Sequence, residues 1–215
     1  MTDIGTADLA RFLRLFTQRL EERKGELTEL DARIGDADHG INMARGFNAV
    51  VGKLDSLGDG TPGALAKQVG MTLISTVGGA AGPLYGTFFL RFAGAAGEAA
   101  TLSPQLLGEA LRAGLEGVAQ RGKAEADDKT MVDAMRPAVE AYEAAIGDGV
   151  PAALGAAAEA AAAGRDRITP LVARKGRASY LGERSANHQD PGATSTTILF
   201  EALRDAMAAG DAGAA

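Results

Sequence analysis

Apolar residues recur at steps of three and four along almost the whole chain, and this periodicity is the feature that most constrains the fold. Such spacing places the apolar side chains on one face of an α-helix. The alternation that marks a strand is scarce, and its one local candidate, TTILF at 196–200, runs into a helical stripe. Counting stripes against typical helix lengths predicts an all-α bundle of about eight helices. The clearest stripes are Leu9, Phe12, Leu13, Phe16 and Leu20; Phe47, Val50, Val51 and Leu54; Leu107, Leu111, Leu115 and Val118; and Leu199, Ala202, Leu203 and Ala206.

Three dipeptides mark where helices begin. Thr61-Pro62 and Ser103-Pro104 each place a hydroxyl side chain before a proline, and Asp190-Pro191 has the same form with a carboxylate. The first residue can cap the helix, and proline fits the first helical position. We therefore expect helices to start at these points.

Length and composition indicate one domain over residues 1–215, with a tail that frays after about residue 207. The formal charge is −6 and there is no concentrated basic tail, which argues against binding to nucleic acid or anionic membranes. The chain has no cysteine, so thiolate metal sites, disulfides and cysteine nucleophiles are excluded.

The first residues carry acids where a signal peptide would carry positive charge. The longest mainly apolar stretch, residues 69–96, contains several glycines, a proline and an arginine, which makes it a poor membrane span. We expect a soluble, cytoplasmic protein.

Four segments interrupt the helical pattern: residues 35–40, 78–82, 122–130 and 176–192. Glycine alone could simply end helices there, but it does not explain the acids and the histidine packed between the glycines. Long, chemically specific loops on a helical scaffold usually carry function.

The first of these segments follows Asp31 and contains Asp36 and Asp38, which forms a cluster of three carboxylates. Carboxylates this close repel one another, and a divalent cation relieves the repulsion. Magnesium prefers oxygen ligands and shares them between carboxylates and nucleotide phosphates. The alternative is that Asp36 and Asp38 cap the next helix, but capping needs only one of them. The spacing therefore favours a cation site, and two neighbouring magnesium ions would suit three acids and a diphosphate.

His39 has three interpretations: a phosphate contact, a hydrogen bond that orients an acid, or an ordinary residue at a helix start. A zinc site is weakly supported because His188 is the only other histidine. A two-metal phosphatase remains an alternative, since clustered aspartates also build such sites.

Four motifs, in order, resemble the ADP-binding subunit of bacterial dihydroxyacetone kinases over nearly the whole chain. They are IGDADHGINMARGF (34–47), GGAAGPLYGTFF (78–89), GKAEADDKTMVDA (122–134) and ARKGRASYLGERSANHQDPGATS (173–195). The resemblance implies a barrel of antiparallel helices, with ADP or ATP and two magnesium ions bound in loops at one end.

The resemblance also implies roles for individual residues. The metal ligands would be Asp31, Asp36 and Asp38. The nucleotide would contact His39, Gly40, Ile41, Asn42, Gly79, Ala80, Ala81, Gly122, Thr130, Met131, Arg177, Asp190, Pro191 and Gly192. Within this set, residues 79–81 would offer N–H groups to phosphate, Gly122 and Met131 would hold the adenine end, and no residue acts as a covalent nucleophile.

By the same resemblance, the chain is a phosphotransferase that acts only with partners. The γ-phosphoryl of bound ATP would pass to dihydroxyacetone on a separate substrate subunit, and a phosphohistidine carrier protein of the phosphotransferase system would rephosphorylate the ADP. Alternatives are a kinase subunit for another small ketose or polyol that uses exchangeable ATP, an ADP-dependent regulator of a transcription factor, and an acyl-binding helical barrel. A homodimer is also an option. DADHGINM argues against the acyl-binding alternative, whose loop typically reads DGDTGTNM.

Three positions depart from the family pattern: Ala81 replaces a serine, and Asp127 and Asn187 replace glycines. Asp127 adds negative charge near the nucleotide loop. Asn187 tolerates positive φ, so we expect its turn to survive. In the one basic cluster, we expect Arg165 and Arg167 to form a solvated face and residues 174–177 to contact phosphate or a partner.

We predict that Ala81→Ser tightens ADP binding, because a hydroxyl at this position adds a hydrogen bond to a charged phosphate. Such bonds contribute about 1.5–3 kcal/mol in mutational series. Recovery of about 1.4 kcal/mol corresponds to roughly tenfold tighter binding. Dissociation rates of a fluorescent ADP analogue from both forms measure the effect, and equal rates would show that residue 81 does not face the phosphates.

Overall fold

A computed structural model describes residues 3–54 and 60–212, and the regular secondary structure of these residues is helical apart from one isolated antiparallel bridge between Ile4 and Leu102. The all-α prediction is confirmed, and residues 196–200 lie inside a helix. The α-helices are α1 (Thr6–Glu22), α2 (Lys24–Ile34), α3 (His39–Leu54), α4 (Pro62–Thr76), α5 (Ala81–Ala96), α6 (Pro104–Gly122), α7 (Met131–Ala145), α8 (Val150–Ile168) and α9 (Pro191–Ala212). Two 3₁₀ segments are η1 (Ile146–Asp148) and η2 (Arg177–Ser185).

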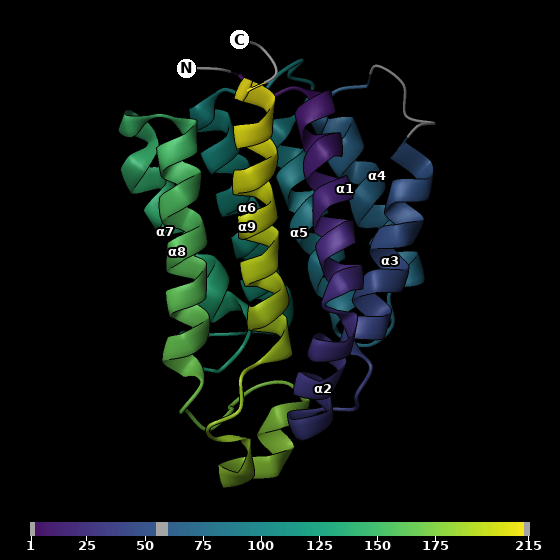
Figure 1. The fold of residues 1–215 in the computed structure, drawn as a ribbon, viewed down its shortest axis with the longest axis vertical. Coiled ribbons are helices and arrows are strands. Elements are labelled where there is room, and N and C mark those ends of the chain that lie inside the picture. The colour runs from purple at the N-terminus through teal and green to yellow at the C-terminus, as the bar shows by residue number, and fades with distance from the viewer. Residues whose placement is uncertain (1–2, 55–59, 213–215) are drawn as a thin grey trace.

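The helices form a closed antiparallel barrel (Figure 1). Each helix from α3 to α9 packs on its neighbour in the chain, and α1 closes the ring by packing on both α9 and α3. Helices α1 and α2 run in the same direction and are separated only at Arg23, whose φ of −101° and ψ of 12° interrupt the helix. Counted as one broken helix, they bring the number of antiparallel passes to the eight that the sequence predicts.

The three predicted helix starts are confirmed by their caps. Thr61 Oγ1 accepts a hydrogen bond from the Ala64 N–H at 3.2 Å, and Ser103 Oγ accepts one from Leu106 N–H at 3.1 Å. The Asp190 carboxylate accepts from Ala193 N–H at 2.7 Å. Each cap satisfies one of the N–H groups that the first turn of a helix leaves without a partner.

The barrel interior is filled by the apolar stripes of the sequence, with aromatic rings in edge-to-face contact at its centre. The Phe47 ring lies 4.7 Å from Phe16, measured between centroids, and Phe88 lies 5.2 Å from Phe89. Such geometry adds about 0.5–1.5 kcal/mol per pair to the burial of the rings. The alanine-rich segment 153–164 belongs to α8, and its buried alanines let α8 pack closely on α7 and α9.

Alternate helices begin at the same end of the barrel, which is the lower end in Figure 1. The segments that precede α3, α5, α7 and α9 gather there, together with α2 and η2, and they correspond to the four interruptions of the sequence pattern. The opposite end carries the start of α1 and the end of α9.

The tail is expected to fray after about residue 207; α9 extends to Ala212, and residues 213–215 lie outside the described residues. The predicted loop 176–192 contains the short 3₁₀ turns of η2, which are broken at Gly182 by a φ of 55°. In the described part of the chain, none of the helices combines the length and apolarity that a membrane crossing requires.

Candidate functional site

An open cavity lies at the loop end of the barrel, between the starts of four helices. Within the described residues, its wall includes the first turn of α3, α5, α7 and α9. The N-terminus of a helix carries partial positive charge and N–H groups that lack intrahelical partners, so it attracts anions. Four such ends around one cavity form an environment suited to negative charge.

Asp31 lies in the last turn of α2 and is only 7% exposed. One of its carboxylate oxygens, Oδ2, accepts from the N–H groups of Asp38 at 2.8 Å and His39 at 3.1 Å. Asp31 therefore caps α3 from the preceding helix. The capping role that was considered for Asp36 and Asp38 belongs to Asp31 instead.

Asp36 and Asp38 are consequently free for another role. Asp36 Oδ2 forms an ion pair with Arg177 Nη2 at 2.8 Å, and the Asp38 carboxylate forms no hydrogen bond or ion pair with any described residue. One oxygen from each of the three aspartates lies within 4.8 Å of the others. This arrangement offers hard oxygen ligands that converge on one point, as a divalent cation requires.

The start of α5 is the one helix N-terminus at the cavity that receives no side-chain cap from the described residues. Asp31 contacts the start of α3, Thr130 and Asp133 form a capping box on α7, and Asp190 caps α9. Before α5 the chain instead reads Gly78-Gly79-Ala80, and Gly79 adopts a φ of 64° that favours glycine. The unsatisfied N–H groups of α5 thus face the cavity beside the Asp38 carboxylate, and they are suited to bind an anion.

His39 lies on the cavity wall, and its Nε2 is 3.0 Å from Ser195 Oγ. Burial lowers the pKa of His39 to about 4, although the Asp31 carboxylate opposes this shift. The ring is therefore neutral at pH 7. Tyr85, which also borders the cavity, hydrogen-bonds to Ser195 at 2.8 Å, and burial raises its pKa to about 12.

Asp190 combines its capping role with an unusual proton affinity. Burial is the main reason that its pKa is raised to about 7, and the carboxylates of Asp133 and Asp31 add to the effect. The Ala193 N–H and the Lys129 ammonium oppose it. Burial therefore accounts for most of the raised pKa of Asp190, and the neighbouring carboxylates add a repulsion that a bound cation would relieve.

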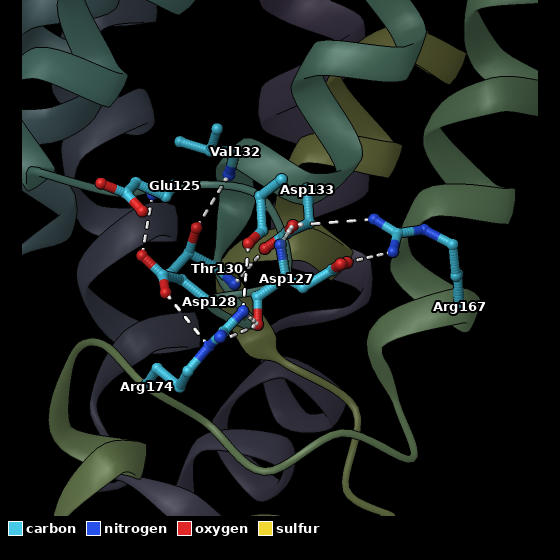
Figure 2. Close-up of polar contacts among 9 residues, drawn as sticks. Glu125, Asp127, Asp128, Thr130, Val132, Asp133, Arg167 and Arg174 are labelled. Carbon is cyan, nitrogen blue, oxygen red and sulfur yellow. Dashed lines mark hydrogen bonds and ion pairs between the residues drawn. The ribbon is translucent and has the colours of Figure 1, made fainter.

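The loop between α6 and α7 is anchored by the buried Asp133 (Figure 2). Its carboxylate accepts from the N–H groups of Asp127 at 2.6 Å and Thr130 at 2.9 Å. Asp127 has a φ of 63°, which fits the family's preference for glycine here, and its carboxylate pairs with Arg167 on α8. The added negative charge of Asp127 is thereby directed to Arg167. Because both side chains are about half exposed, this pair contributes less than about 1 kcal/mol.

The structure gives partners to several residues of the basic cluster. Arg167 pairs with Asp127 and lies 3.7 Å from Asp133, and Arg165 pairs with Asp166. Arg174 donates to the carbonyl groups of residues 126 and 127 and pairs with Asp128, as Figure 2 shows. It contacts this loop rather than lining the cavity. By contrast, the turn at Asn187 does survive, with a φ of 62°.

Lys129 joins two loops through its ammonium group. Its Nζ donates to the carbonyls of Thr169 at 2.8 Å, Leu171 at 2.8 Å and Ser185 at 2.7 Å, which uses all three of its N–H donors. The residue is only 1% exposed, and burial lowers the pKa of its side chain. Lys129 borders the cavity but is fully engaged with protein, so it holds the loop before α7 against the segment before α9.

Most of the predicted site residues lie around this one cavity. Those on its wall are Asp31, Asp36, Asp38, His39, Gly79, Ala80, Ala81, Thr130, Met131, Arg177, Asp190, Pro191 and Gly192. They come from five separate parts of the chain.

Four predicted nucleotide contacts do not line the cavity. A Cβ on Gly40 would lie 2.2 Å from the Lys24 carbonyl oxygen, so this glycine permits α3 to pack on α2. Ile41 is 50% exposed, and the buried Asn42 accepts a hydrogen bond from Arg45 and packs beneath Gly78. Gly122 ends α6 and lies near Leu84, which does border the cavity.

The cavity also includes residues outside the predicted metal and nucleotide contacts. Lys175 and Gly176 belong to the basic segment that was expected to contact phosphate or a partner, and the others were missed: Ile34, Gly35, Gly78, Leu84, Tyr85, Lys129 and Ala178. All of them lie within the quoted motifs, so their positions in the sequence could have indicated them. Their orientation could not be predicted, because it depends on contacts between distant loops.

The fold and the site together define a class of protein: an all-helical barrel that can hold an anionic ligand and a divalent cation where its helices begin. The chain belongs to the family described as the DAK2 domain, which matches residues 33–205.

Similar chains are ADP-binding subunits of kinases. The chain is 50% identical over 179 residues to the ADP-binding subunit of the PEP-dependent dihydroxyacetone kinase of Escherichia coli (strain K12), covering 82% of this chain and 85% of that protein. It is 41% identical over 204 residues to the ADP-binding subunit of the PTS-dependent dihydroxyacetone kinase of Lactococcus lactis, covering 92% and 95%.

A longer kinase contains the same fold. The crystal structure of the dihydroxyacetone kinase of C. freundii matches with a TM-score of 0.74 at 28% identity, covering 95% of this chain and 36% of that one. The structure of that kinase in complex with AMP-PNP and Mg²⁺ matches with a TM-score of 0.72 at 29% identity, covering 95% and 35%.

We predict that Lys129→Met lowers the free energy of unfolding by at least about 2 kcal/mol, because buried carbonyl groups lose a charged donor. Urea unfolding measures this change. Lys175→Met is the matched control, since Lys175 borders the same cavity without a hydrogen-bond partner among the described residues, and it should leave the unfolding free energy nearly unchanged. Equal stability of the two variants would contradict the structural role of Lys129.

Proposed function

We propose that this chain is the nucleotide-binding subunit of a dihydroxyacetone kinase, a phosphotransferase that holds ADP or ATP with magnesium. The observation that carries the proposal is the uncapped start of α5 next to the aspartate cluster. An anion-binding helix end beside converging carboxylates fits a phosphate chain that shares a cation with the protein. The similarity to ADP-binding subunits supports the same function.

Asp36 and Asp38 would hold the metal, and Asp31 would join them through the carboxylate oxygen that does not cap α3. Two of the three acids lack a capping role in the fold, so the donor set fits a cation well. Magnesium bound there would neutralise charge on the phosphate oxygens. Three carboxylates and a diphosphate suit two such ions.

The remaining wall residues would orient the nucleotide. The N–H groups at the start of α5 would bind phosphate oxygens, and Arg177, now paired with Asp36, would bridge the metal ligands and the phosphate chain. Ile34, Leu84 and Met131 supply apolar surface at the cavity, which suits the adenine ring. In phosphoryl transfer, positioning and charge stabilisation provide most of the catalysis.

Dihydroxyacetone would bind on a separate subunit, which presents its hydroxyl group to the γ-phosphoryl at the cavity mouth. The relatives that this chain matches over most of their length are named as subunits, whereas the C. freundii kinase chain is much longer. The names of the relatives also support a phosphohistidine carrier protein of the phosphotransferase system as the donor that regenerates ATP from bound ADP.

We predict that Asp36→Asn or Asp38→Asn weakens magnesium-dependent ADP binding at least about tenfold, because each change removes a charged ligand of the cation. Calorimetry with and without a chelator measures the affinity. Helical content and unfolding should change little, since neither carboxylate caps a helix. Asp148→Asn, an exposed change in η1, is the matched control and should bind ADP like the natural protein. Unchanged affinity in both site variants would reject the metal assignment.

A second prediction concerns the division of labour between subunits. The purified chain with ATP and magnesium should phosphorylate no dihydroxyacetone, because the acceptor site lies on the partner. Addition of the cognate substrate subunit and a phosphoryl source should produce dihydroxyacetone phosphate in a coupled assay. Robust product formation by the single chain would overturn the proposed subunit role.

A further inference from the structure

Ser195 lies at the centre of a buried polar chain that joins two residues of the cavity wall. The residue is 0% exposed, in the first turns of α9, where Thr194, Thr196 and Thr197 are also fully buried. Its hydroxyl contacts three groups: His39 Nε2 at 3.0 Å, the Tyr85 hydroxyl at 2.8 Å and the Gly192 carbonyl at 3.1 Å. Buried hydroxyl groups on a helix can form all their hydrogen bonds with carbonyl groups of that helix. Ser195 contacts such a carbonyl and also contacts side chains of α3 and α5.

Only one placement of the protons makes all three contacts of Ser195 hydrogen bonds. The Gly192 carbonyl can only accept, so in this arrangement the Ser195 hydroxyl donates its single proton there. Its two lone pairs then accept from Tyr85 and from His39. Tyr85 can supply its O–H, because its oxygen also has Thr196 Oγ1 at 3.3 Å as a second hydroxyl partner. His39 must then carry its proton on Nε2.

We propose that Ser195 and Tyr85 are positioning residues that hold the His39 ring with its proton on Nε2 and with Nδ1 offered to the cavity as a hydrogen-bond acceptor. No described residue bonds to Nδ1, although His39 borders the cavity. The His39 backbone N–H is already bound to Asp31, which holds the start of α3 and the ring's attachment point in place.

This assignment selects among the roles of His39. A phosphate oxygen can only accept, so Nδ1 without a proton gives it no hydrogen bond. The matching ligand groups are donors, such as a water molecule on the cation or a hydroxyl group of the ribose. This part rests on the proposed nucleotide function, whereas the protonation pattern itself does not.

The competing arrangement places the Ser195 proton on the bond to His39. Nε2 would then be the acceptor, Nδ1 would carry the proton, and the ring would present a donor suited to a phosphate oxygen. The two arrangements share the same heavy-atom distances, so they differ only in where the protons lie. That difference is measurable.

The first experiment is ¹⁵N NMR of the ring nitrogens in the full chain without nucleotide, at neutral pH. The sequence has only two histidines, so a His188→Asn variant assigns the signals of His39. We expect Nε2 to be protonated, with a slowly exchanging proton, and Nδ1 to be unprotonated. A proton on Nδ1 would overturn the proposal, and this measurement requires no folded variant at position 195.

The second experiment tests the link to the ligand with Ser195→Ala. The Nε2 proton of His39 should lose its slow exchange, and calorimetry should show affinity for ADP and magnesium reduced about threefold to tenfold, the effect of one hydrogen bond. Thr197→Val is the matched control, because it removes a buried α9 hydroxyl that bonds only to carbonyls. It should leave both readouts unchanged.

Addition of ADP and magnesium to the natural protein completes the test. We expect the Nδ1 signal to shift while Nε2 keeps its proton. Binding of ADP without any change at Nδ1 would overturn the acceptor role, as would unchanged His39 signals in Ser195→Ala. Absence of ADP binding by calorimetry would instead reject the proposed function and leave the protonation assignment to the first experiment.

Discussion

Closure of the helices into one antiparallel ring is the constraint on which the rest of the structure depends. It forces every second helix to begin at the same end, and four positive helix termini therefore converge on one cavity. Such convergence is unfavourable unless negative groups compensate it. Asp31, Asp133 and Asp190 do so for α3, α7 and α9, and each binds backbone N–H groups directly.

The carboxylates and the positive helix termini at the cavity do not match one to one, and the mismatch is of two kinds. The start of α5 has no carboxylate of its own, whereas Asp36 and Asp38 are carboxylates that cap no helix. A ligand with both negative oxygens and a bound cation satisfies the two deficits at once.

Sequence periodicity predicted the helical fold and the eight antiparallel helical passes well. A helix that buries one face has apolar residues at steps of three and four, and this spacing is visible in the sequence. The helix caps at Thr61 and Ser103 were predicted equally well, because each is a hydroxyl residue directly before a proline. The acid spacing predicted a cluster, but it considered only Asp36 and Asp38 as possible caps of the next helix. The cap is Asp31, which reaches α3 only after the intervening turn folds back. Lys129 was missed because its three acceptors lie 40, 42 and 56 residues further along the chain.

The start of α1 and the end of α9 lie at the end of the barrel opposite the cavity (Figure 1). Helix α9 has 22 residues, which corresponds to a length of about 33 Å. A domain fused to either end would need a tether that runs the full height of the barrel before it could reach the mouth. A separate protein approaches the mouth directly and can leave again. The same geometry lets the protein be anchored to a surface through either terminus with its cavity still open to solution.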